Sequence, residues 1–459
     1  MQYTINKEKD LMGQSTIKFS VGTALLMGTF AMQNTLADSY VFITNTTPET
    51  VSVQVNHTGT QILQHGNQWA QEATQIAPYE TKRVLRMNRY SGLKSGQTYN
   101  FDTVVSSGSS QVTFKQSMTG TWYGSTIKHG MQTASTTSPW YTDRNIYRIN
   151  TVYAGLAAQT AVKAEYTGGY DDFHYTIHQN TVTEPVSNNA DEIKVLSYNI
   201  YALPMVASKI SERLAELPQH LNGYDVILMQ EAFSSSRTGM LNQLAQQYPY
   251  QTHVPIGSGY NLFDSGVLVL SRYPIVKTAE MIYPDCTGTD CFADKGVIYA
   301  EIIKNGKAYH VTSTHTASFD TNEARALRQV QFQQIRQLIN QQNIPSFDAV
   351  LMGGDFNVNK LLWPQDYQDM LTNLNATAPV STGYTASTFD PRINKLAGAA
   401  GSGGTTVEYL DYVVSSNNHR QPTQSRNDVR ILRSAADPLF MTWDLSDHFP
   451  VMGHFNYNP

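Results

Sequence analysis

The chain is poor in charged residues, and this shortage excludes two classes of protein. Only 15% of its 459 residues are charged, and 37 acidic against 32 basic residues give a formal net charge of −5. No basic tail or arm stands out that would follow the phosphates of a nucleic acid. With a hydrophobic content of 41%, the composition also excludes an intrinsically disordered chain. We expect a folded protein without a nucleic-acid partner.

The sequence also lacks an apolar run long enough to cross a membrane. The run from Val21 to Met32 has about 12 residues, whereas a spanning helix needs roughly 20. Lys18 precedes this run and the small-residue stretch 35–37 follows it, which predicts a signal peptide over residues 1–37 with cleavage near Ala37. An uncleaved membrane anchor is the alternative. We expect a secreted, extracellular protein.

Cysteine is almost absent, with only Cys286 and Cys291 in the segment DCTGTDC. In an exported protein this pair favours a disulfide bond. The loop that it closes is small, so the expected stabilisation is on the order of 2 kcal/mol. A metal-binding pair is the less favoured alternative, because the spacing differs from CxxC and no matching cluster of His or Cys accompanies it.

Two kinds of pattern divide the rest of the chain, and its length fits two domains. Residues 38–180 contain alternating apolar and polar runs, such as Tyr40–Thr46 and Thr50–Thr58, separated by clusters of Gly, Asn, Ser and Thr. This pattern predicts an all-β, sandwich-like N-terminal domain. The polar segment 181–191, with one proline, is typical of a linker.

From residue 192 to residue 459, short apolar strands alternate with helical stretches. Lys194–Ser197, Val226–Met229 and Ala349–Met352 have the composition of buried strands, and a long helix is expected over Asn322–Gln342. Strands that alternate with helices indicate a mixed α/β domain in which sheets pack under helices.

Polar residues follow several of these strands, at the position where α/β folds place their active sites. A hard divalent cation prefers oxygen ligands, and it can neutralise charge on a phosphoryl oxygen and lower the pKa of a bound water. A histidine beside a carboxylate suits a general base, and a second histidine can donate to phosphate oxygens. Each residue alone has an ordinary structural explanation, but their recurrence at successive strand ends predicts one active site. They are Asn199, Glu231, His315, Asp355, Asn357, Asp411, Asp447 and His448.

The short motifs YNI, QE, GDFN, LDYVV and SDH occur here in the order found in the deoxyribonuclease-like endonuclease/exonuclease/phosphatase superfamily. The resemblance covers about Glu192 to Phe455. Within the superfamily the chain most resembles the bacterial neutral sphingomyelinases (sphingomyelinase C), through SYNIYALP, THTAS, GGDFNVN and FADKG. This resemblance implies a four-layer α/β sandwich of two β-sheets flanked by helices. It also implies hydrolysis of membrane sphingomyelin to ceramide and phosphocholine with Mg²⁺, or with another divalent cation.

The resemblance assigns the metal and the base to particular residues. Glu231 is implied as the main metal ligand, with Asn199 assisting it. His448 is implied as the general base that activates the attacking water. Asp411 and Asp447 would orient the histidines and stabilise their charge.

The same resemblance assigns the phosphate contacts. His315 and Asn357 are implied to bind the phosphate and stabilise the pentacoordinate transition state. Asp355 would help to position the water or the metal, and Asp294 in FADKG would be an additional polar residue of the site.

Two features depart from the family's Gram-positive members. Those proteins enter the membrane with an aromatic β-hairpin before the last motif, whereas this chain has only a short segment there. Phe440, Met441 and Trp443 are its candidates for membrane contact, with packing inside the protein as the alternative. A second metal site at the edge of the cleft is not expected, because the polar ligands of those members are replaced here by the serines of residues 234–236.

Three tryptophans of the N-terminal part, Trp69, Trp122 and Trp140, could bind sugar or lipid headgroups or could belong to the sandwich core. Two rival functions also remain open. One is a secreted nuclease of the same fold, which the scattered basic residues near the motifs disfavour. The other is a catalytically dead toxin subunit that binds lipid or glycan, which the complete residue set disfavours. The basic residues are Lys209, Arg237, Lys295 and Lys360.

Overall fold

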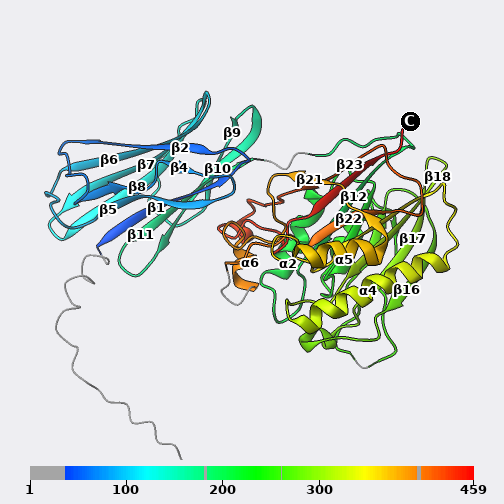
Figure 1. Ribbon diagram of the computed structural model, residues 1–459. Coiled ribbons are helices and arrows are strands. Elements are labelled where there is room, and N and C mark those ends of the chain that lie inside the picture. Colours follow the sequence, from blue (N-terminus) through cyan, green and yellow to red (C-terminus); the bar gives the residue numbers. More distant parts are fainter. Residues whose placement is uncertain (1–36, 180–182, 260, 401–404, 459) are drawn as a thin grey trace, which may run out of the picture.

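A computed structural model describes residues 37–179, 183–259, 261–400 and 405–458, and it shows two lobes (Figure 1). The predicted signal peptide lies outside these residues except for Ala37, so it stays a prediction. Among the described residues, the helices are all too short or too polar to cross a membrane.

The N-terminal lobe contains strands β1 to β11, arranged in two sheets that face each other across one core (Figure 1). One sheet has the order β3-β5-β1-β11-β10-β9 and the other β4-β2-β6-β7-β8. Strand β2 shows why the chain folds this way, because Val51, Val53 and Val55 are buried while the residues between them are exposed. The strands are β1 (Asp38–Thr46), β2 (Val51–Gly59), β3 (Trp69–Gln71), β4 (Gln75–Ile76), β5 (Thr81–Asn88), β6 (Thr98–Ser107), β7 (Ser110–Thr121), β8 (Gly124–Gln132), β9 (Tyr147–Tyr153), β10 (Leu156–Tyr166) and β11 (Asp171–Gln179).

The C-terminal lobe contains two further sheets packed face to face. Their orders are β14-β15-β13-β12-β24-β23-β21 and β16-β17-β18-β19-β22-β20. Val195 and Leu228 of the first sheet share one apolar cluster with Val311 and Leu351 of the second. The strands are β12 (Glu192–Asn199), β13 (Val226–Gln230), β14 (Tyr250–Gln251), β15 (Leu268–Ser271), β16 (Ile275–Ile282), β17 (Gly296–Lys304), β18 (Lys307–His315), β19 (Ala349–Asp355), β20 (Ala376–Thr377), β21 (Val380–Gly383), β22 (Asp411–Ser416), β23 (Gln424–Val429) and β24 (Val451–Asn456).

Helices cover the outer faces of these two sheets. Phe332 and Ile335 of α4 pack on Val350 and Met352 of β19, and residues of α2 and α3 pack on the other sheet. This layered arrangement agrees with the predicted α/β sandwich. The helices are α2 (Ile210–Glu216), α3 (Arg237–Leu244), α4 (Asn322–Gln341), α5 (Pro364–Leu374) and α6 (Lys395–Ala400), with 3₁₀ turns η1 (Leu217–His220), η2 (Gly288–Phe292) and η3 (Asp437–Leu439).

The pairing of the strands brings distant polar residues to one edge of the sandwich. β12 runs parallel to β13, so Asn199 lies opposite Gln230, and Glu231 follows directly. β18 runs parallel to β19, which pairs His315 with Asp355, and β22 adds Asp411 opposite Asp355. The carboxyl ends of β12, β13, β18 and β19 therefore form the edge on which the predicted site residues lie.

The two lobes contact each other through the segment between β23 and β24. Arg433 in this segment donates from Nη1 to the carbonyl oxygen of Tyr79 at 3.1 Å and from Nε to Asp444 at 2.7 Å. Phe440 and Trp443 pack against Ala161 of β10 and are only 6% and 2% exposed. The burial of Phe440 and Trp443 favours the alternative, packing inside the protein, while Met441 is half-buried beside them.

The tryptophans of the N-terminal lobe and the two cysteines have definite places. Trp69 packs against the core of the N-terminal lobe. Lys115 and Lys128 lie over the ring of Trp140. Trp122, in the turn between β7 and β8, is 87% exposed. The predicted disulfide is confirmed, with Cys286 and Cys291 joined at an S–S distance of 1.98 Å.

Candidate active site

Three oxygen-bearing side chains meet at the edge of the sandwich. The Nδ2 of Asn199 donates to Glu231 Oε1 at 3.0 Å and to Asp355 Oδ2 at 3.1 Å. Glu231 has φ of 55°, a left-handed conformation that a non-glycine residue adopts only where its surroundings hold it. Because Glu231 follows β13 directly, this turn aims its carboxylate towards the ends of β12 and β19. The residues come from three strands and converge on one point.

The electrostatics of this cluster fit a divalent cation. Burial raises the pKa of Glu231 to about 7, and the charges of Asp447 and Asp355 add to the effect. Burial likewise raises the pKa of Asp447. Carboxylates gathered so closely repel one another unless a positive charge lies between them. Oxygen donors with excess negative charge are the surroundings that Mg²⁺ prefers, and Glu231, Asn199 and Asp355 are the residues that would hold it.

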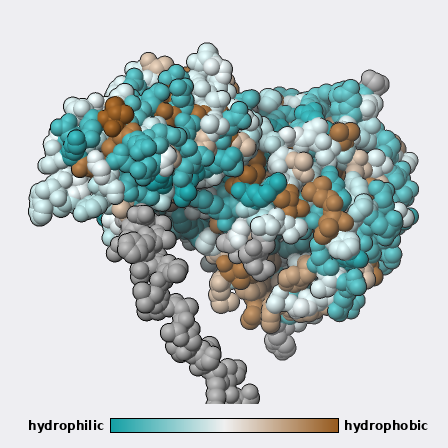
Figure 2. Space-filling view, turned by 60° about the vertical axis from the view of Figure 1, so that its left-hand side comes forward, coloured by the Kyte–Doolittle hydropathy of each residue, from teal (hydrophilic) through white to brown (hydrophobic). Residues whose placement is uncertain are grey.

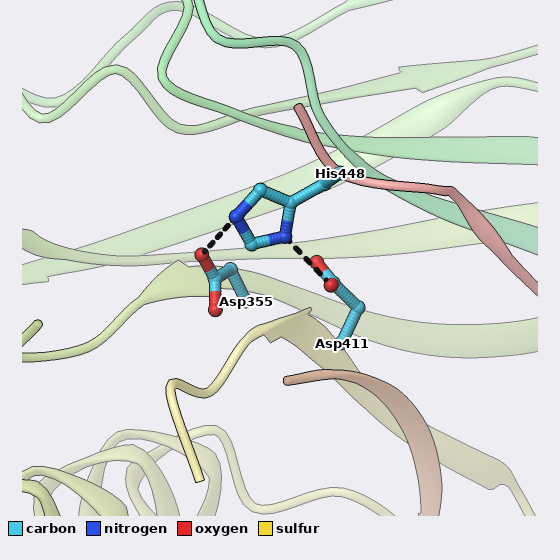
Figure 3. A group of neighbouring side chains, drawn as sticks. All are labelled: Asp355, Asp411 and His448. Atoms are coloured by element: carbon cyan, nitrogen blue, oxygen red, sulfur yellow. Dashed lines mark hydrogen bonds and ion pairs between the residues drawn. The ribbon is translucent and has the colours of Figure 1, made fainter. Parts of the chain in front are cut away.

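His448 forms the second part of the site, between two carboxylates (Figure 3). Its Nδ1 lies 2.8 Å from Asp411 Oδ2, and its Nε2 lies 3.7 Å from Asp355 Oδ2. Burial alone would lower the pKa of this imidazole, but the charges of Asp411 and Asp355 outweigh it and raise the pKa well above the usual value. One ligand atom of each of these three residues lies within 4.8 Å of the others, a spacing that a metal ion could also use. We favour a base with its orienting carboxylate, since Asp411 already occupies Nδ1.

His315 lies on the other side of Asp355, with Nε2 3.5 Å from Asp355 Oδ2. The Nζ of Lys295 lies 3.2 Å from His315 Nε2 and also bonds the carbonyl oxygen of Thr316 at 2.8 Å. Burial lowers the pKa of His315 to about 3, and the charge of Lys295 adds to the effect. His315 is therefore a neutral imidazole beside a cationic ammonium group.

Asn357 and Asp447 complete the predicted set. The backbone N–H of Asn357 donates to Asp355 Oδ1 at 3.0 Å, and its Nδ2 donates to the carbonyl oxygen of Thr316 at 3.3 Å. Ser446 Oγ donates to the carbonyl oxygen of Asn199 at 2.6 Å and lies 3.2 Å from Asp447 Oδ1. The SDH motif is thereby tied to the end of β12.

Asp294 contacts a loop beside this cluster. Its carboxylate accepts hydrogen bonds from the backbone N–H of Gly257 at 2.8 Å and from Asn261 Nδ2 at 2.6 Å. These contacts fix a neighbouring loop and do not join Asp294 to Glu231 or His448. The residue of FADKG that contacts the site is the next one, Lys295, whose Nζ lies beside His315 Nε2.

The sequence interpretation missed the roles of two basic residues. Lys295 was weighed only as a possible phosphate contact of a nuclease, although its place beside Asp294 in FADKG was a usable signal. Arg213 of α2 is buried, and its Nη1 donates to the carbonyl oxygens of Ile200 and Leu445, both at 2.9 Å. It joins the segment after Asn199 to the segment before His448. No sequence motif marked it.

The other basic residues near the motifs are engaged within the protein. Arg237 pairs with Asp264 at 2.7 Å. Lys209 donates to the carbonyl oxygen of Pro438 at 2.7 Å, and Lys360 donates to Ser381 Oγ at 2.7 Å. These contacts give no extended basic track for a nucleic acid.

Comparisons with known proteins show to which family the chain belongs. Residues 196–448 match the endonuclease/exonuclease/phosphatase family. The chain is 33% identical to sphingomyelinase C of Listeria ivanovii over 294 residues, which covers 58% of this chain and 87% of the relative. It is 31% identical to a phospholipase C of Staphylococcus aureus over 293 residues, covering 57% and 87%.

Solved structures of sphingomyelinases and of a beta toxin also match the chain. The structure of SmcL matches with a TM-score of 0.53 and 31% identity, over 58% of this chain and all of the other. Sphingomyelinase C from Streptomyces griseocarneus also gives 0.53 and 31%, over 58% and 99%. A beta toxin from Staphylococcus aureus with bound magnesium ions gives 0.53 and 30%, over 58% and 100%. The chain belongs to the endonuclease/exonuclease/phosphatase family, and within it to the bacterial sphingomyelinases C.

Proposed function

We propose that this protein is a secreted, Mg²⁺-dependent phosphodiesterase that hydrolyses sphingomyelin to ceramide and phosphocholine. One observation carries the proposal. Glu231 with Asn199, and His448 with Asp411, come from distant parts of the chain and converge on Asp355. The names of the relatives support a phosphodiesterase, and sphingomyelin is the substrate that several of those names imply.

The residues divide into a metal side and a proton-transfer side. Glu231 and Asn199, with Asp355 beside them, would hold Mg²⁺, which when bound neutralises negative charge on the phosphoryl group. On the other side, Asp411 accepts the Nδ1 hydrogen of His448, so in the neutral imidazole the lone pair is on Nε2, which faces the site. His448 then takes the proton of the attacking water at Nε2.

The remaining residues meet the phosphate. Lys295 places a positive charge 3.2 Å from the neutral imidazole of His315, on the side of Asp355 away from Asp411. Donors fixed in advance at this position stabilise the charge that builds up on the non-bridging oxygens in the transition state. Asn357 is held beside them by its bond to Thr316.

The test is release of phosphocholine from sphingomyelin vesicles by the purified chain from Asp38 onward. We expect release with Mg²⁺, none with EDTA, and a loss of about 10²–10⁴-fold in rate for His448→Ala. No release above the EDTA control would contradict the proposal. Nicking of plasmid DNA at low salt without release of phosphocholine would favour the nuclease instead.

Secretion rests on the N-terminal pattern alone. We expect the mature protein in the culture medium of the producing cells, beginning at or near Asp38. N-terminal sequencing of the exported protein checks this, and a chain retained in the membrane with an intact N-terminus would contradict it.

A further inference from the structure

Several large apolar side chains beside the active site remain exposed to solvent. Met205 is 90% exposed, Leu262 68%, Val206 62%, Phe292 55% and Phe319 54%. All five line one pocket of about 580 Å³ together with Glu231, Lys295 and His315. We call these five residues the apolar rim. Exposed apolar side chains that gather around a functional pocket mark an interaction site.

Two of the loops that carry the apolar rim, those of Leu262 and Phe292, are fixed to each other. The backbone N–H of Leu262 donates to the carbonyl oxygen of Phe292 at 3.0 Å, and Phe263 pairs with Ala293. The disulfide Cys286–Cys291 closes the loop just before Phe292. Leu262 and Phe292 therefore stay exposed on a supported surface, and their side chains do not fold back into the core.

The chemistry of the apolar rim fits a bilayer with zwitterionic headgroups. Among the charged residues that line the pocket, Asp290 and Lys295 pair with each other at 3.2 Å, and Glu231 belongs to the active site. A surface that binds anionic lipids carries a cluster of lysines and arginines, which this lining does not have. Aliphatic and aromatic side chains that enter the boundary between headgroups and acyl chains need no such cluster.

Other parts of the molecule are less suited to contact a membrane. The N-terminal lobe buries Phe440 and Trp443. Figure 2 shows apolar groups breaking the surface of the larger lobe in several separate places, whereas the visible face of the smaller lobe is mostly hydrophilic. Only a surface that adjoins Glu231 and His315 can bring a membrane lipid to the reacting groups without lifting it far out of the bilayer.

We propose that the apolar rim is the membrane-docking surface of this protein and that it inserts into the headgroup region of bilayers rich in sphingomyelin or phosphatidylcholine. The proposal rests on the proposed function only in its choice of a lipid surface as the occupant. It places membrane contact on the loops after β12, before β15, around η2 and after β18, and it leaves the segment before the last motif as a contact between the lobes.

Binding and turnover are measured separately to test it. Flotation with vesicles of sphingomyelin and phosphatidylcholine, in EDTA, measures binding without hydrolysis. We expect Met205→Asp/Phe292→Asp to lower the bound fraction by about tenfold or more. Phe347→Asp is the matched control, because Phe347 is 74% exposed but precedes β19 at the end of the sheet away from the active site. Hydrolysis of the soluble diester p-nitrophenylphosphorylcholine should stay within about twofold in all variants, since surface changes leave the reacting groups in place.

A gain of signal tests the same surface independently of any loss of folding. In Met205→Trp, fluorescence should shift to the blue on vesicle binding and be quenched by brominated lipids. Binding should also change little between low and high salt, because no ion pairs carry it. Unchanged binding of Met205→Asp/Phe292→Asp, or no binding by the wild-type chain, would overturn the proposal. So would loss of binding on Trp122→Asp alone, which would assign docking to the turn between β7 and β8.

Discussion

At the scale of single residues, the pair His448 and Asp411 makes the sharpest prediction. Asp411 fixes the tautomer of His448 and, with Asp355, raises its pKa. Asp411→Asn should lower kcat by about 10²–10⁴-fold. Loss of the Asp411 charge should also lower the pKa of His448, so the rising limb of the pH profile should move to lower pH. Asp369→Asn on α5 is the control, and an unshifted profile would remove Asp411 from this role.

Short sequence motifs identified some residues of the candidate site but not others. The residues of YNI, QE, GDFN, LDYVV and SDH were all found from short motifs, and the structure brings them together. Lys295 directly follows the predicted Asp294, and only the structure shows that Lys295 contacts His315 whereas Asp294 bonds the loop at Gly257. Arg213 acts through backbone carbonyls of segments far apart in the chain, which no local pattern can reveal.

At the scale of elements, α4 supports the strand end that carries His315. Its Gln331 accepts the backbone N–H of Ala317 at 2.8 Å, and its Arg328 donates to the carbonyl oxygen of the same residue at 3.1 Å. Gln331→Leu leaves that buried N–H without an acceptor, so we expect about 1–3 kcal/mol less stability and a lower kcat. Urea denaturation and steady-state kinetics measure both.

The matched control on the same helix is Gln333→Leu, because Gln333 is exposed and its side chain donates to Asn373 Oδ1. Its effect should stay within about 0.5 kcal/mol. Equal effects of the two substitutions would contradict a supporting role for Gln331.

At the scale of the whole molecule, Arg433 joins the two lobes. Arg433 and Asp444 are each only 2% exposed and form a pair at 2.7 Å, and Arg433 also reaches the carbonyl oxygen of Tyr79. Arg433→Met leaves Asp444 buried without its partner, which should cost about 3–5 kcal/mol. Asp444 lies four residues before His448, so activity should fall as well. Calorimetry measures the melting temperatures of Arg433→Met and of the surface control Arg426→Met, and we expect only Arg433→Met to melt at a lower temperature. Equal melting temperatures of the two variants would contradict the prediction.

The N-terminal lobe should also respond to acid. Burial lowers the pKa of His178 to about 3 and those of His129 and His174 to about 4. Between pH 6.5 and about pH 4, the unfolded chain binds protons that the folded lobe does not, so stability is complete above pH 6.5 and falls as the pH drops. Each histidine contributes about 1.4 kcal/mol per pH unit. Hydrogen exchange of strands β8 and β11 at pH 7 and pH 5 measures this, and equal opening free energies would contradict it.

The sequence by itself determined the alternating strands, the helix over α4, the disulfide and the candidate site residues at the strand ends, because these depend on local periodicity and on short motifs. Only the tertiary structure decided which surface is free. Phe440 and Trp443 are large apolar residues of the kind that enter membranes, yet they pack against β10 and are buried. Met205 and Phe292, in contrast, are exposed to solvent. The exposure of a side chain depends on packing between segments that are distant in the chain, so it cannot be predicted from residue type alone.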